Sequence, residues 1–135
     1  MTTNGQGKKV LVVPLLPGKR LFTHGQTQTV EIDVGSLEKM GPMIEKMRVH
    51  FDGADYSANF QARFLFRWSV AGRIWSSDVE ILANQTSEGQ VIGSWYTNDT
   101  TLGLNMKYFL EYSNTTGTAA EWGRVAAWLE VVLKS

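Results

Sequence analysis

Apolar and polar side chains alternate along residues 60–70, with Leu65 as the only apolar residue on the polar side. An α-helix would scatter the apolar residues around its axis, whereas a β-strand gathers them on one face. The pattern therefore predicts a half-buried antiparallel strand. Its apolar positions are Phe60, Ala62, Phe64, Phe66, Trp68 and Val70.

Two later segments show the same alternation with departures from it. Residues 104–112 carry apolar or tyrosine side chains at the even positions, and Phe109 interrupts the polar odd positions. Residues 125–133 are apolar at the odd positions, which predicts the side that faces the core. Trp128 and Val132 make the opposite side of this last strand apolar as well.

The rest of the chain divides into short runs separated by Gly, Pro, Asn and Asp. We expect a turn at residues 71–72 to join the 60–70 strand to the next strand in a hairpin. Residues 36–40 can form one helical turn, which Gly41 and Pro42 end. Together these runs predict about eight strands, and therefore an all-β antiparallel sandwich of the jelly-roll type rather than a seven-stranded immunoglobulin-like one. The other predicted strands are residues 10–16, 21–24, 28–34, 43–51, 73–82 and 90–97.

Size and composition fit one domain. The 135 residues carry 13 Lys and Arg against 13 Asp and Glu, so the formal net charge is zero. A neutral chain lacks the long-range attraction that nucleic acid or an anionic membrane would need, and we expect neither as a partner. We predict a flexible polar arm at residues 1–9 and a sandwich at residues 10–135. The N-terminus lacks the apolar core of a signal peptide, so we expect a protein that is made and used inside a cell.

No set of residues points to catalysis or to a cofactor. There is no cysteine, and the two histidines, His24 and His50, are too few for a three-histidine metal site. Three aspartates near predicted turns offer at most a weak calcium site, because calcium usually takes six or more oxygen ligands. Paired acids such as Asp78 and Glu80 also describe an ordinary solvated strand face. We therefore expect a protein that is not an enzyme and that has no metal and no cofactor. The three aspartates are Asp52, Asp55 and Asp78.

Aromatic residues leave two interpretations open. Tryptophans at alternating strand positions usually belong to a core, but exposed rings on a sandwich can stack against sugars. A carbohydrate-binding module for host or glycan recognition is therefore the alternative function. Its stacking set would be Trp75, Trp95, Tyr96 and Trp122.

Apolar residues on otherwise polar faces favour self-association. Exposed apolar patches on small soluble monomers are uncommon, so a strand with two apolar faces lies either at the centre of a covered sheet or against a neighbour. We predict a subunit interface that contains Leu65, Phe109, Trp128 and Val132.

The chain also resembles a known protein family. Its Met-Thr-Thr start, the Asn-Thr-Thr-Gly segment at residues 114–117 and a final strand at residues 123–134 are similar to the small jelly-roll decoration or cement proteins on the heads of tailed phages. The resemblance implies a structural virion protein that assembles in the host cytoplasm, often as a trimer. It also implies that the arm, with Lys8 and Lys9, lies on a major capsid protein or another virion protein.

Overall fold

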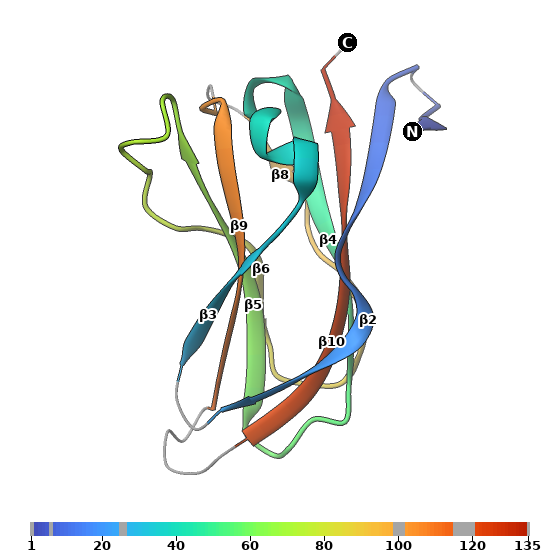
Figure 1. Ribbon diagram of the computed structural model, residues 1–135. Coiled ribbons are helices and arrows are strands. Elements are labelled where there is room, and N and C mark those ends of the chain that lie inside the picture. The colour runs from blue at the N-terminus through green and yellow to red at the C-terminus, as the bar shows by residue number, and fades with distance from the viewer. Residues whose placement is uncertain (1, 6, 25–26, 99–101, 115–120, 135) are drawn as a thin grey trace.

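The computed structural model describes residues 2–5, 7–24, 27–98, 102–114 and 121–134. These residues form two antiparallel sheets that face each other as a sandwich (Figure 1). The prediction of an all-β antiparallel sandwich is confirmed. The strands are β1 (Thr2–Thr3), β2 (Lys9–His24), β3 (Gln28–Ile32), β4 (Ile44–Ala54), β5 (Phe60–Ser69), β6 (Val79–Gln85), β7 (Gly89–Ile92), β8 (Tyr96–Thr97), β9 (Asn105–Asn114) and β10 (Glu121–Leu133), and two short 3-10 helices are η1 (Gly35–Lys39) and η2 (Gly41–Met43).

The strand order is that of a jelly roll. One sheet has the order β1-β2-β10-β4-β7, with β8 also paired to β4, and the other has the order β3-β9-β5-β6. Leaving aside the two-residue strands β1 and β8, the eight remaining strands pair in a nested way. The first pairs with the last, the second with the seventh, the third with the sixth and the fourth with the fifth. This nesting of two Greek keys is the jelly-roll topology.

The core lies between the sheets and follows the alternation in the sequence. On β5 the rings of Phe60, Phe64 and Phe66 point inward and are buried. On β10 the odd-numbered residues from Val125 to Val131 are fully buried. A strand alternates its side chains between two faces, so the even-numbered residues of β10 point outward.

Three segments differ from the sequence-based expectation. β2 is one long strand with register shifts opposite residues 125–128, where two short strands were predicted. Residues 70–78 form a loop between β5 and β6, so the predicted two-residue turn at residues 71–72 is wrong. The predicted strand at residues 90–97 is split into β7 and β8. In each case tertiary contacts outweigh the local pattern.

The described part of the predicted arm folds back on the sheet. Thr2 and Thr3 pair with Val10 and Lys9 of β2, and Gly7 N donates to Asn4 O over 3.0 Å. Residues 1 and 115–117, which contribute to the family resemblance, and residue 6 of the predicted arm lie outside the described residues.

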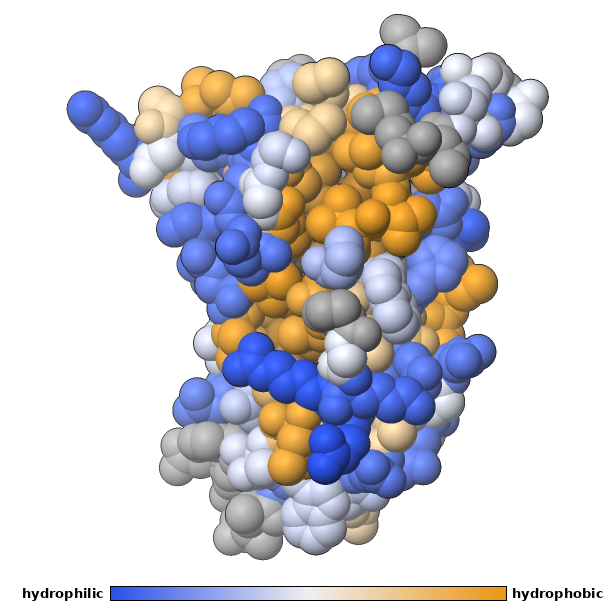
Figure 2. Space-filling model, turned by 45° about the vertical axis from the view of Figure 1, so that its right-hand side comes forward, coloured by the Kyte–Doolittle hydropathy of each residue, from blue (hydrophilic) through white to orange (hydrophobic). Residues whose placement is uncertain are grey.

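One side of the sandwich leaves part of the core in view. β2 and β3 lie at the corresponding edges of their sheets, apart from the short pairing of β2 with β1 (Figure 1). Leu11 and Val13 on β2 and Val30 on β3 pack against the core but remain partly exposed. From the side on which β2 comes forward, Figure 2 shows apolar side chains in a band between polar flanks.

Candidate interaction surfaces

On the outer face of the β3-β9-β5-β6 sheet, the apolar residues are covered by neighbouring side chains. Leu65 and Phe109 are cross-strand partners on this face, and their exposed fractions are only 2% and 9%. The guanidinium carbon of Arg67 lies 5.0 Å from the centre of the Phe109 ring. Leu65 and Phe109, both predicted at a subunit interface, are thus already buried within one chain.

Ion pairs extend across the same face. Arg63 Nε donates to Glu111 Oε1 over 2.8 Å, and Arg63 Nη1 donates to Glu80 Oε2 over 3.0 Å. These hydrogen bonds raise the pKa of the Arg63 guanidinium. Arg67 pairs with Asp78 in the same way. The face is charged and internally satisfied, which suits contact with water.

The outer face of the β2-β10-β4-β7 sheet is different. Trp128 is half-buried between its cross-strand partners Pro14 and His50. On the flanking strands, Val12 is 63% exposed and Ile92 is 61% exposed. Val132 points to this face too, but it is only 2% exposed, between its cross-strand partners Val10 and Lys46. Apolar side chains therefore reach solvent on both sides of Trp128.

A small polar network stabilises the centre of this face. Glu130 Oε1 accepts hydrogen bonds from Arg48 Nε over 2.8 Å and from His50 Nε2 over 2.7 Å. Burial acts to raise the pKa of Glu130, but the hydrogen bonds from His50 and Arg48 outweigh it, so the pKa lies below its ordinary value. The Arg48 guanidinium also stacks 4.1 Å from the Trp95 ring centre. A groove of about 440 Å³ runs beside Trp128 and His50.

The four rings of the alternative glycan site lie in separate places. Trp75 is on the side of the β3-β9-β5-β6 sheet, 4.6 Å from the Lys107 ammonium. Trp95 is on the other sheet, beneath Lys46 and Arg48. Tyr96 packs edge-on against the core residue Phe66, and Trp122 is exposed at the start of β10. The structure does not bring these rings together as one platform.

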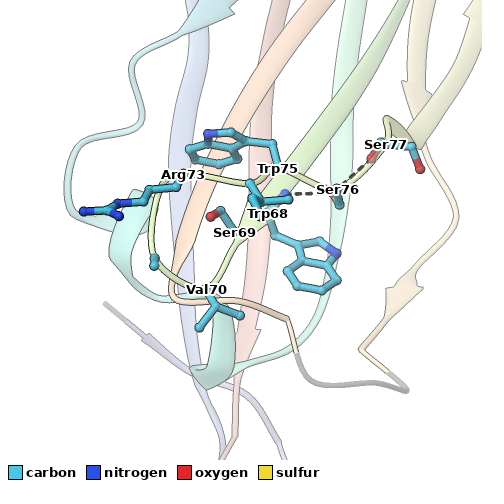
Figure 3. Close-up of a pocket in the computed structure, with 9 residues that line it drawn as sticks. Trp68, Ser69, Val70, Arg73, Trp75, Ser76 and Ser77 are labelled. Atoms are coloured by element: carbon cyan, nitrogen blue, oxygen red, sulfur yellow. Dashed lines mark hydrogen bonds between the residues drawn. The ribbon is translucent and has the colours of Figure 1, made fainter.

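The loop at residues 70–77 encloses an apolar pocket of about 650 Å³ (Figure 3). Its walls include Trp68, Val70 and Trp75, and Figure 3 shows the two indole rings on opposite sides of the backbone. Ser76 closes the loop, because its N–H donates to Trp68 O over 2.8 Å and its Oγ accepts from Trp68 N over 3.0 Å.

The lysines of the predicted arm differ in their surroundings. Lys8 pairs with Glu45 at the start of β4, whereas Lys9 is exposed. The shell-binding role of both lysines stays a prediction.

The aspartates considered for calcium each pair with a different cation. Asp52 lies 3.5 Å from Lys19 Nζ, Asp55 lies 3.2 Å from Arg124 Nε, and Asp78 pairs with Arg67. Among the described residues, no three His, Cys, Asp or Glu side chains are grouped so that they could hold a metal ion. None of the described helices has the length and apolar character needed to cross a membrane.

Comparison with known proteins gives a fold rather than a family. No family model and no characterised protein sequence matches the chain. It is similar to a solved structure of infectious bursal disease virus, Gx strain, with a TM-score of 0.63 and 8% identity, over 97% of this chain and 33% of that chain. A VP2 subviral particle of the same virus gives a TM-score of 0.60 and 10% identity, over 93% of this chain and 32% of that one.

These similarities establish a shared jelly-roll fold. The chain spans about one third of the length of the two viral chains. TmCBM61, solved with beta-1,4-galactotriose, gives a TM-score of only 0.36 at 12% identity over 95% of this chain and 84% of that chain, which is too low to support the glycan alternative.

Sequence reasoning missed part of the apolar outer face. Val12, Pro14 and Ile92 flank Trp128 only because β2 and β7 lie in the same sheet as β10. The even positions of residues 10–14 are apolar, and this was a usable signal that β2, like β10, is apolar on both faces. The pairing of His50 with Glu130 joins residues 80 positions apart and has no local signal.

Proposed function

We propose that this chain is a non-enzymatic structural subunit of a virus particle, which associates with its own copies and binds the shell as a decoration or cement protein. The observation that supports this is the fold: over 97% of its length the chain is similar to part of a structure of infectious bursal disease virus. A jelly roll alone does not define a function, since lectins and other binding proteins share it. The proposal therefore rests also on the surface of the chain.

The outer face of the β2-β10-β4-β7 sheet is the proposed contact between copies. It exposes Val12, Pro14 and Ile92 around the half-buried Trp128, whereas the opposite sheet covers its apolar residues with ion pairs. An interface centre typically holds a tryptophan or arginine within an apolar patch that excludes water. Trp128 with Arg48 fits that description. Leu65, Phe109 and Val132 act in this proposal as support beneath the surface.

The proposed assembly is a homotrimer on the outside of a shell. Each trimer would present three arms, each with Lys8 and Lys9, to a major capsid protein. Several weak contacts on one rigid particle raise the effective affinity without any new chemistry. The protein would then be found in the virion after assembly in the host cytoplasm.

Sedimentation velocity tests the contact between copies. At the lowest protein concentration measured, we expect the unmodified chain to sediment as a trimer and the Val12→Asp variant to lose that trimer, because the new carboxylate would be buried in an apolar contact. Val12 is 63% exposed, so the variant is expected to fold. Thr29→Asp places the same charge on the exposed face of the other sheet and is expected to leave the trimer intact. A monomeric unmodified chain, or equal loss with Thr29→Asp, would contradict the proposal.

A further inference from the structure

Exposed apolar side chains gather at one end of the sandwich. Of the nine large apolar residues that are exposed in the described part of the chain, four lie there: Met43, Val70, Ile74 and Leu104. Their segments touch one another, since a Cβ on Gly103 would lie 2.5 Å from the carbonyl carbon of Ser69. This is the end at which β5 stops and β9 begins (Figure 1). Such a concentration on one end indicates a contact surface.

The 70–77 loop is the most prominent part of that end. Ile74 is 87% exposed and Val70 is 73% exposed, the highest values among the large apolar residues described. The loop is fixed by the two hydrogen bonds between Ser76 and Trp68, and by Gly72 N, which donates to Ser69 Oγ over 2.8 Å. A fixed loop loses little conformational entropy on binding, so it can present Ile74 as an anchor.

The opposite end carries a hollow with an apolar wall. It measures about 460 Å³, and Leu21 and the half-exposed Trp122 contribute its apolar surface. Trp122 is held in place by its backbone, which donates to Ser57 Oγ over 2.8 Å and accepts from Ser57 N over 2.8 Å. The full lining is Leu21, Thr23, Asp55, Glu121, Trp122 and Arg124.

The exposed charges at the two ends are complementary. Beside the protruding loop, Arg73 and Lys39 are exposed, and neither forms an ion pair within the described part of the chain. Around the hollow, the Asp55 side chain is 71% exposed and lies 3.2 Å from Arg124 Nε, and the exposed Glu88 accepts a hydrogen bond from Tyr56 N over 2.6 Å. Two carboxylates, Asp55 and Glu121, line the hollow against one cation, Arg124. The excess of carboxylate at this end matches the cations beside the loop, which favours one relative orientation of two copies.

We propose that the 70–77 loop of one copy docks into the Leu21 and Trp122 hollow of a second copy, so that copies associate head to tail. Ile74 inserts beside the Trp122 indole, and Arg73 approaches the carboxylates of Asp55 and Glu88. The two surfaces are different, so the contact is heterologous, and a pair of copies keeps one free loop on one copy and one free hollow on the other. Repetition of this contact gives a ring or an open chain. It uses none of the residues of the sheet-face contact, and the two contacts can fail independently.

Mixing two defective variants tests this head-to-tail contact. Both are made in the Val12→Asp background, which removes the sheet-face contact, and self-association is measured by sedimentation over a concentration series. We expect Ile74→Asp and Trp122→Ala each to weaken self-association at least about tenfold, as for the loss of an interface anchor. An equimolar mixture of the two is expected to form a dimer of one copy each, because one intact loop and one intact hollow remain. Both residues are exposed, so circular dichroism is expected to show unchanged folds.

Three results would overturn the proposal. The Val12→Asp chain could remain monomeric at every concentration, so that there is no second contact. The mixture of the two variants could stay monomeric, which would point to a symmetric contact or to none. Thr29→Asp, added to the same background as a charge control on the outer face of the other sheet, could weaken association as much as Ile74→Asp.

Discussion

Gly103 occupies a position where no side chain fits. A Cβ there would lie 2.5 Å from the carbonyl carbon of Ser69 and 2.8 Å from the Trp68 ring. We expect Gly103→Ala to lower the free energy of unfolding by about 1–3 kcal/mol, the usual cost of overpacking. Gly18→Ala is the control, because a Cβ at Gly18 would meet nothing within 4 Å. Urea denaturation of both variants measures the difference, and equal effects would show that the close approach does not matter.

Glu130 links stability to pH through its two hydrogen-bonded partners. Its lowered pKa means that the folded chain favours the ionised carboxylate, so the stabilisation is present above the ordinary glutamate pKa of about 4.3. It is lost as the pH falls through the lower folded-state pKa. We expect Glu130→Gln to lower the free energy of unfolding by about 1 kcal/mol at pH 7.

The difference in the free energy of unfolding between the Glu130→Gln variant and the unmodified chain is expected to disappear in strongly acidic solution, where both side chains are neutral. Denaturant titrations from pH 7 downward measure it. Glu38→Gln is a control, since Glu38 forms no ion pair with any residue the structure describes. A constant difference at all pH values would show that charge on Glu130 is not what stabilises the network.

At the scale of elements, strands with a clear alternation were predictable and their connections were not. The apolar face of residues 60–70 is the inner face of β5, because burial of one face repeats with the period of the strand. The loop at residues 70–78 replaced a predicted turn because Ser76 bonds to the Trp68 backbone and residues 69–70 contact Asn105. Such contacts between distant segments have no local sequence pattern.

The candidate surfaces were likewise predictable where a local pattern decides them, and not where contacts between distant segments do. The outward direction of Trp128 could be read from the last strand, because the odd positions were clearly the core side. That Phe109 lies beneath Arg67, and that Leu65 is buried as its cross-strand partner, depends on the pairing of β5 with β9. Long arginine side chains can cover apolar surface while their charged ends stay in water. An apolar residue on a polar strand face is therefore a weaker sign of a partner than it first looks.

At the scale of the whole molecule, the nested pairing makes the last strand essential. β10 lies between β2 and β4 and forms the centre of its sheet, and its inward residues from Val125 to Val131 are fully buried. Without β10, β2 and β4 have no shared partner, and the core loses one wall. We expect a chain that lacks residues 121–135 to lose cooperative thermal unfolding, followed by circular dichroism. A chain that lacks residues 1–5 is expected to keep it, because only the two-residue strand β1 is removed.

A separate peptide of residues 121–135 extends this test of topology. The space that β10 leaves is bordered by two strands that both pair with it in an antiparallel way, so the peptide has one register that buries its odd-numbered residues. We expect the peptide to restore cooperative unfolding to the shortened chain, and a Leu129→Asp peptide to fail, because Leu129 is fully buried. Cooperative unfolding of the shortened chain alone would show instead that the remaining strands form a core without β10.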